Sequence, residues 1–402
     1  MIIPITSYPL FVNHYSRYFK DIVGSCLYDS FKSYLTGLII LSKHRISDIA
    51  NISKLKISYE QLQYFLSDSD FDYELLNQRR INLLENNPKT SSKTEQGIGI
   101  VDDSLSHKTG LSIEAVGKHF DHCQHKYTLA HNIVTSHFLN SRTDWPINLT
   151  IYQKYADLPE NDKSEFKTKI QIAKEHISYA QKQNIKIKIW IFDSWFLCKE
   201  LIEHIGDSAD WISVLKSNRK FRRGNQIFKV SQYAEELKET DFQEVSLKAK
   251  KYLIHHLTAD ISKLGRAGMF FIKDSLEDKN ITVLVTNRTD WEAVKAIKTY
   301  LKRWQIENFY RAAKQNLGLE EYMVRKLDSA QRHMHLTFLA YSLLELKRQS
   351  SRLNKSFNYL QDTVGNLCKN VNEELLHGFI SWIRRQLILN HSTEQIIKLL
   401  RC

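Results

Sequence analysis

The sequence predicts an α/β protein in which helices flank a mixed β-sheet, with a β-rich insertion and an N-terminal helical domain. Three observations indicate this class. Residues 97–101 form an apolar run typical of a buried strand, residues 185–192 alternate isoleucine with lysine and end in apolar residues, as a strand does, and each segment is followed directly by an aspartate. Residues 226–287 contain several more strand-like segments. Residues 1–85 instead place apolar side chains at helical spacing.

The composition favours a nucleic-acid partner. The chain has 402 residues, 42% of them hydrophobic, which is enough for two or three domains. Its 57 lysines and arginines outnumber 45 acidic residues, giving a formal net charge of +12. An excess of this size favours binding to a polyanion. The five cysteines are scattered without paired spacing, which indicates a reducing cytoplasm rather than a disulfide framework.

The N-terminal region is expected to be a helical DNA-binding domain. Residues 18–42 predict one helix, and residues 46–66 predict two short helices separated by a turn. Residues 44–66 fit a DNA-reading helix-turn-helix or an ordinary helical hairpin, and both alternatives stay open. The polar run at 86–96 predicts a linker that ends this domain.

Acidic side chains follow two predicted strands. Asp102 and Asp103 come directly after residues 97–101, and Asp193 comes directly after residues 185–192. Carboxylates from separate elements that converge at one place are the pattern required for two-metal phosphoryl transfer. Either member of the Asp102–Asp103 pair could provide the first carboxylate.

A basic cluster and a β-rich stretch follow the second aspartate. Residues 211–215 predict a short strand that leads into basic residues, among them Lys216 and Arg219, which could line a path for DNA. The chain between Asp193 and Glu307 is too long for a structureless loop. It contains four strand-like segments, at residues 243–247, 252–257, 269–273 and 281–285.

A helix beginning near Thr289 presents an ionic stripe. Steps of three, four and seven residues place the following side chains on one face: Tyr300, Arg303, Glu307, Arg311 and Lys314. Thr289 and Glu292 fit a capping box. The opposite face is expected to be anchored in a core by Val294, Ile297, Leu301 and Trp304. Taken alone, the stripe fits a solvated face in which Arg303 and Glu307 pair.

The order of residues in this stripe resembles the signature of DDE transposases from bacterial insertion sequences. That signature is Tyr, two residues, Arg, three residues, Glu, six residues and Lys, and it is matched by Tyr300, Arg303, Glu307 and Lys314. Asp102 and Ser104 also match the Asp-x-Ser pattern of the first catalytic position. The resemblance implies an RNase H-like core with a β insertion between the second aspartate and the glutamate.

The resemblance also implies site residues and partners. Asp102, Asp193 and Glu307 would be the catalytic acids, with Asp103 as the alternative to Asp102, and would bind two Mg²⁺ ions, with Mn²⁺ as a substitute. A homodimer would cut double-stranded DNA at the element ends and join the freed 3' hydroxyl to target DNA. The side chains expected to contact DNA are Tyr300, Arg303, Arg311, Lys314, Lys216 and Arg219.

The expected domain order follows from these assignments. It comprises an N-terminal helical domain at 1–85, the first part of the RNase H-like core at 97–217, the β-rich insertion at 218–287, the rest of the core at 288–350 and a C-terminal helical region at 351–402. The apolar runs are too short to span a membrane, and no signal peptide is expected. A bacterial cytoplasmic protein that associates with the nucleoid when it binds DNA fits these features.

Two other functional classes stay open at this point. One is a transposase-derived DNA-binding protein that no longer cuts, and the other is an RNase H-like nuclease that cuts without strand transfer. Adjacent ligand-type residues at Asp121, His122, Cys123 and His125 lack a second paired set, so a polar turn is favoured there over a zinc site.

Overall fold

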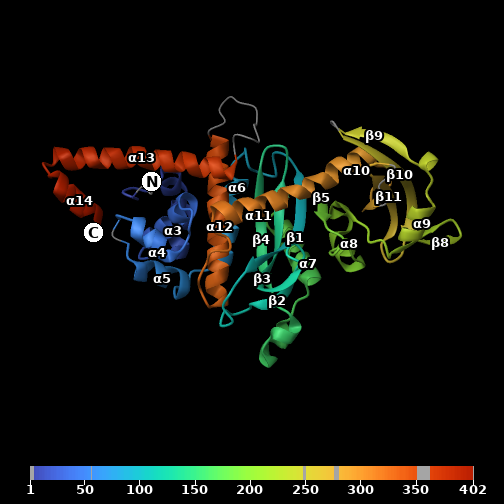
Figure 1. Ribbon diagram of the computed structural model, residues 1–402, viewed down its shortest axis with the longest axis horizontal. Helices are drawn as coiled ribbons and strands as arrows, with labels where there is room; N and C mark the ends of the chain where they lie inside the picture. The colour runs from blue at the N-terminus through green and yellow to red at the C-terminus, as the bar shows by residue number, and fades with distance from the viewer. Residues whose placement is uncertain (1–3, 56, 248–249, 276–279, 351–362, 402) are drawn as a thin grey trace.

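The computed structural model describes residues 4–55, 57–247, 250–275, 280–350 and 363–401. Within these residues a twelve-stranded mixed sheet is flanked by helices, which confirms the α/β class. Figure 1 shows the N-terminal helices on one side of the long helix α12, the sheet beyond it, and the insertion at the opposite end of the molecule. No helix among the described residues is both long enough and apolar enough to cross a membrane.

The N-terminal region forms a cluster of short helices. Their bounds are α1 (Leu10–Ser16), η1 (Arg17–Phe19), α2 (Lys20–Val23), α3 (Tyr28–Ile40), α4 (Ile46–Ile52), α5 (Tyr59–Ser67) and α6 (Tyr73–Glu85). The single helix predicted over residues 18–42 is wrong, because Gly24 ends α2 with a φ of 77°, a conformation that glycine adopts without steric cost. The two short helices predicted over 46–66 are present as α4 and α5.

The polar run at 86–96 is packed rather than exposed. Thr90, Ser91 and Ser92 are all buried. The carboxylate of Glu85 accepts hydrogen bonds from Ser91 Oγ at 3.0 Å and from the Ser92 backbone N–H at 3.1 Å. The indole of Trp145 donates to the Thr90 carbonyl at 3.1 Å. The run predicted to be a linker is therefore packed against the protein, and these contacts satisfy its buried polar groups.

The central part of the sheet has RNase H-like topology. Its strands are β1 (Gly97–His107), β2 (Gly117–Asp121), β3 (Lys126–Leu139), β4 (Asp144–Tyr152), β5 (Ile187–Phe192) and β6 (Asp210–Val214). Five of them lie in the order β4–β3–β1–β5–β6. β1 pairs antiparallel with β3 and parallel with β5, and β5 pairs parallel with β6. β2 pairs with the first residues of β3.

The β-rich insertion extends this sheet instead of forming a separate one. Its elements are β7 (Lys220–Arg223), β8 (Gln226–Lys229), α9 (Val230–Glu236), η5 (Glu239–Asp241), β9 (Gln243–Leu247), β10 (Lys250–Ile261), β11 (Gly265–Lys273) and β12 (Thr282–Thr286). β12 pairs antiparallel with β6 of the core, so the sheet is continuous. The four predicted segments correspond to β9–β12. The hairpin β7–β8 was not predicted, because its four-residue strands are mostly polar.

Helices cover both faces of the central sheet. The remaining elements are η2 (Tyr155–Asp157), η3 (Glu160–Glu165), α7 (Lys169–Lys182), α8 (Lys199–Ile205), η4 (Gly206–Ser208), α10 (Ala293–Tyr300), η6 (Leu301–Arg303), α11 (Trp304–Asn316), α12 (Leu327–Ser350), α13 (Val364–Ile388) and α14 (Thr393–Arg401). α7 packs on β3 and β4, whereas α10 and α11 contact β6, β12 and β1. In Figure 1, α10 and α11 run from α12 across the sheet to the insertion.

The helix that carries the ionic stripe differs from the prediction in three respects. It begins at Ala293, and its N-cap residue Glu292 makes no side-chain capping bond, so the predicted capping box at Thr289 is wrong. A 3₁₀ turn, η6, interrupts it between α10 and α11. Because a 3₁₀ turn has three residues per turn, it changes which side chains face the core. Ile297 is buried as expected, but Leu301 and Trp304 are about half exposed.

The central strand β1 needs glycine where aromatic rings cross it. A Cβ atom at Gly99 would lie 2.4 Å from the Trp190 ring. Gly99→Ala is therefore expected to lower the free energy of unfolding by about 1–3 kcal/mol, because the buried ring must shift. Gly378→Ala in α13, where a Cβ would meet only Ser7 Oγ at 3.1 Å, is the matched control and is expected to be neutral or stabilising. Urea denaturation of both variants measures the difference, and equal effects would contradict this account.

Candidate active site

Asp102 and Asp193 lie at equivalent positions on neighbouring parallel strands. The parallel pairing of β1 with β5 ends at Val101 and Phe192, and each aspartate is the next residue. The strand predicted to end at residue 101 continues to His107, because β3 goes on pairing with it. Since β5 stops at Phe192, the edge of β1 is open from Asp102 onward. The side chains of both aspartates therefore meet at one opening of the sheet.

Arg303 joins Asp102 to Glu307. Its guanidinium donates to Asp102 Oδ2 at 2.7 Å and also forms an ion pair with Glu307. The three side chains are mostly buried, with exposed fractions of 13% for Asp102, 20% for Arg303 and 30% for Glu307. Asp102 Oδ1 accepts the backbone N–H of Asp103 at 2.9 Å. The positive charge thus bridges an acid of β1 and an acid of α11.

Asp103 faces the opposite layer of the molecule. Successive side chains of a strand point to opposite faces of the sheet. Asp102 accordingly contacts Arg303 on the α11 side, whereas Asp103 forms an ion pair with Lys169 Nζ, at the start of α7, at 2.9 Å. Of the two aspartates, Asp102 is the one that shares a cation with Glu307, which supports its choice as the first acid.

Burial raises the pKa of two of these carboxyl groups. The pKa of Asp102 is raised to about 7, mainly by burial and further by the charges of Asp193 and Asp103, although Arg303 opposes the shift. Burial also raises the pKa of Asp193, while the N–H groups of Trp195 and Phe196, which donate to its Oδ1 at 2.9 and 3.2 Å, oppose the rise. Burial is therefore the main cause of both shifts, because it disfavours the ionised form of each carboxyl group.

A hollow of about 570 Å³ opens over these acids, and we call it the acidic hollow. Its lining includes Asp102, Asp103, Asp193, Trp195, Lys169 and Lys314. Glu307 is not part of the lining and reaches the group through Arg303. Lys314 donates to the Leu105 carbonyl at 2.8 Å and pairs with Glu320. The hollow thus combines carboxylates with lysines, as a site for a metal-bound phosphate requires.

Comparison with family models gives a match to the DDE superfamily endonucleases. The matched residues are 29–236, a little more than half of the chain, and include Asp102 and Asp193. This chain is a DDE superfamily endonuclease. No curated protein matches it. The family assignment makes the chain an enzyme that acts on DNA, and enzymes of this superfamily generally use divalent metal ions.

The donor set of this DDE endonuclease fits a hard divalent cation. Carboxylate oxygens from Asp102, Asp193 and Glu307 are the ligands that Mg²⁺ and Mn²⁺ prefer. The raised pKa of Asp102 indicates that additional positive charge would be stabilised there. Among the described residues no three His, Cys, Asp or Glu side chains already form a metal-binding group. Cation binding by all three acids therefore requires Arg303 to move from between Asp102 and Glu307.

The other predicted DNA-contacting residues separate into two regions. Tyr300 lies near the acids, whose charges add to burial in raising its pKa to about 12. Lys216 is exposed just beyond β6, and Arg219 donates to the Leu197 carbonyl at 2.8 Å. Arg311 instead lines a second cavity, between α11, α12 and the start of α13.

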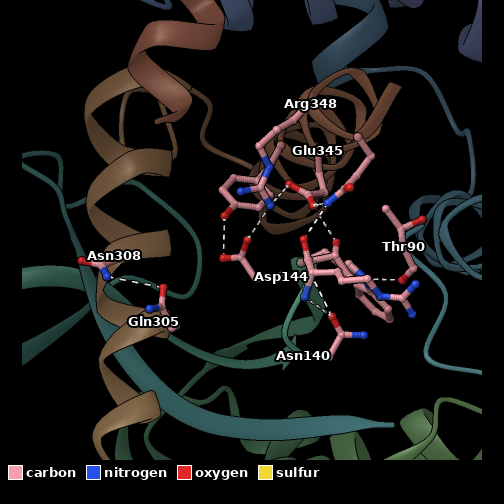
Figure 2. A network of polar contacts seen from close by, with 12 residues as sticks. Thr90, Asn140, Asp144, Gln305, Asn308, Glu345 and Arg348 are labelled. Atoms are coloured by element: carbon pink, nitrogen blue, oxygen red, sulfur yellow. Dashed lines mark hydrogen bonds and ion pairs between the residues drawn. The ribbon is translucent and has the colours of Figure 1, made fainter. Parts of the chain in front are cut away.

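This second cavity lies apart from the acidic hollow. Figure 2 shows its polar network, in which Asp144 accepts hydrogen bonds from Tyr341 at 3.0 Å and from Arg348 at 3.3 Å, with Gln305 and Asn308 on the neighbouring helix. None of the three acids lines it. Arg311 therefore does not line the acidic hollow with Lys314. The contact of Arg311 with DNA stays a prediction.

Several residues of the acidic hollow were not anticipated from the sequence. Lys169 contacts Asp103, and its Nζ lies 5.2 Å from the ring centre of Trp195. The Trp195 side chain is 45% exposed. Beside the hollow, Tyr310 is buried and donates to the Asp102 carbonyl at 3.3 Å. Trp195 lies two residues after Asp193, and this closeness in sequence could have indicated that it belongs to the site. Nothing in the sequence connects Lys169 to Asp103, 66 residues earlier.

The expected polar turn at 121–125 is present. Asp121 Oδ1 accepts the N–H groups of Cys123 and Gln124 at 2.7 and 3.1 Å, and Oδ2 pairs with His107. This use of both carboxylate oxygens agrees with a turn rather than with a zinc site.

The raised pKa of Asp102 gives a pH-dependent expectation. The folded state binds this proton more tightly than the unfolded state, whose pKa is about 3.9, so the stability contribution is complete at low pH and is lost as pH rises toward 7. Asp102→Asn removes the titrating carboxyl group and with it this loss of stability at higher pH. It should be more stable than the native chain at pH 8, by on the order of a few kcal/mol, and should lose this advantage toward pH 4.

Urea midpoints at several pH values test this expectation. Asp207→Asn, at an exposed aspartate, controls for the loss of one carboxylate. A stability difference between Asp102→Asn and the native chain that stays constant from pH 4 to pH 8 would show that Asp102 does not titrate in this range.

Proposed function

We propose that this DDE endonuclease is a transposase that cuts DNA at the ends of an insertion sequence and joins the freed 3' hydroxyl to target DNA. The observation that carries the proposal is the Asp102–Arg303–Glu307 bridge, formed beside Asp193 at the ends of two parallel strands. It agrees with the resemblance of Tyr300, Arg303, Glu307 and Lys314 to the transposase signature.

In this proposal the three acids hold two Mg²⁺ ions, or Mn²⁺ as a substitute. When bound, the two ions would activate the attacking oxygen and stabilise the leaving 3' oxygen. Asp102 and Asp193 are already oriented, the first by Arg303 and the Asp103 N–H, the second by the N–H groups of Trp195 and Phe196. Arg303 would release Glu307 and turn toward the DNA backbone.

The DNA path is proposed to follow the cationic side chains around the acidic hollow. Tyr300, Arg303 and Lys314 would contact the backbone near the cut, with Lys216 and Arg219 beyond the end of β6. Arg311 would contact DNA outside the hollow. Residues 1–85 would bind the element ends, and two copies would act on paired ends. The proposed location is the bacterial cytoplasm, on the nucleoid when DNA is bound.

Cleavage of labelled DNA that carries the element's own ends tests the proposal. With Mg²⁺, the native chain should cut these ends and transfer them to a target plasmid. Glu307→Gln should lower cutting by roughly 100-fold or more while DNA affinity stays within about twofold, because the side chain keeps its size but loses its charge. Glu292→Gln, at the exposed N-cap of the preceding helix α10, is the matched control and should cut normally.

The other outcomes correspond to the two remaining functions. Cutting without any joined product would identify a nuclease that lacks strand transfer. Tight binding without cutting by the native chain would identify a DNA-binding protein that has lost catalysis. Either result would overturn the transposase proposal.

A further inference from the structure

The hairpin β7–β8 forms a basic outer surface at the end of the sheet. Lys220, Arg222, Ile227 and Lys229 are all exposed, and Ile227 is 70% exposed. Lys220 lies directly opposite Lys229, and Arg222 lies opposite Ile227. Like charges directly opposite on neighbouring strands are destabilising. No ion pair joins Lys220, Arg222 or Lys229 to any acid that the structure describes. The pairing therefore retains a repulsion that the folded chain itself does not offset.

Other cations extend this surface. A hollow of about 470 Å³ lies between the hairpin and the turn from β10 to β11, and its lining includes Lys220, Arg222, Ile227 and Lys263. Across the sheet, Arg222 of β7 lies opposite Asp260 of β10, and Asp260 lies opposite Arg266 of β11. The basic side chains of this surface are Lys220, Arg222, Lys229, Lys263 and Arg266, and Asp260 lies between Arg222 and Arg266 in the register. We call this surface the hairpin groove.

The strand register places the hairpin groove on the same sheet face as Asp102. The register connects, strand by strand, Ile100, Ile191, Ile212, Thr286, Gly268 and Thr258. Asp102 lies two residues after Ile100, and Asp260, which lies opposite Arg222, is two residues after Thr258. Because β10 runs antiparallel to β1, these two aspartates lie on opposite sides of that row, about four residues or roughly 13 Å apart along the strand direction. Alternate residues share a face, so Asp102 and Arg222 project from the same one. On the opposite face Phe221 packs against Tyr233 of α9, with ring centres 5.2 Å apart.

The two sites are separated by a distance comparable with one turn of DNA. Six strand spacings of about 4.8 Å separate β1 from β7, or about 29 Å along the sheet. The twist of the sheet shortens the direct path, and the offset along the strands lengthens it. One turn of B-DNA spans about 34 Å. Lys216 and Arg219 lie in the chain between the two sites, at the end of β6.

We propose that the hairpin groove binds the phosphate backbone of the duplex about one helical turn from the phosphate held at the acids. The inference rests on the proposed function for the position of the cut, but the binding itself does not require catalysis. Neutralisation by phosphates offsets the repulsion between Lys220 and Lys229. Among the described strands β8 is the last in the sheet, so Ile227 has no further strand beside it. Its side chain packs against the sugars of the bound DNA strand.

Salt-dependent binding to fluorescein-labelled 30-base-pair DNA duplexes tests the proposal. The variant carries Lys220→Gln, Arg222→Gln and Lys229→Gln in the full chain. The slope of log affinity against log salt should fall in magnitude by roughly 2 to 3, because each lost phosphate contact contributes about 0.9. Affinity at physiological salt should fall roughly tenfold or more. The matched control carries Lys182→Gln, Lys186→Gln and Lys188→Gln, at the other end of β5, and should change the slope by less than about 1.

Duplex length adds a second measurement. The native chain should bind a 20-base-pair duplex more tightly than a 10-base-pair duplex, and the hairpin variant should lose most of this gain. Equal slopes for the variant and the native chain would overturn the proposal. Charges on an edge strand also prevent pairing between the edges of two molecules. If sedimentation showed that the variant self-associates while its slope is unchanged, the charges would serve that purpose and the proposal would be overturned. These measurements record binding and not cutting, so failure of the cutting proposal would be distinguishable from failure of this one.

Discussion

The position of α11 on the sheet depends on the Arg303 guanidinium. It is held between a carboxylate of β1 and a carboxylate of its own helix, and all three groups are mostly buried. Removing one partner of a buried ion pair typically costs about 3–5 kcal/mol, because the remaining charge is left uncompensated. Here one cation faces two carboxylates, with Asp193 close by. The bridge therefore joins Glu307 of α11 to Asp102 at the open end of β1.

The second constraint is the continuity of the sheet. Because β12 pairs with β6, the insertion is joined to the core by backbone hydrogen bonds rather than by a hinge. α10 lies across this junction and contacts β6, β12 and β9. The helix that carries Glu307 and the strands that carry the aspartates thus share one rigid framework with the hairpin β7–β8. Such a framework fixes the spacing between acids and distant cations, which loops could not do.

Sequence patterns predicted those parts of the fold and site that depend on local chemistry. Apolar runs followed by aspartates located β1 and β5, and the β-rich character of β9–β12 was visible in their composition. The capping box at Thr289 was wrong because the helix begins at Ala293, and the burial of Trp304 was wrong because a 3₁₀ turn at residues 301–303 interrupts the helix. Lys169 could not be predicted, since its contact with Asp103 exists only after α7 packs on the sheet. The placement of Arg311 depends likewise on α12 and α13.

The paired aspartates illustrate how a local pattern acquires two roles. Neighbouring residues of a strand must face opposite layers, so an Asp-Asp pair at the open edge of β1 necessarily contacts both. Asp102 connects the strand to α11 through Arg303, and Asp103 connects it to α7 through Lys169. A shift of one residue in the register between β1 and β3 would exchange these partners and separate Asp102 from Glu307. The long antiparallel ladder from Ile98 to His107 prevents that shift, which explains why β1 continues beyond the point where its parallel partner ends.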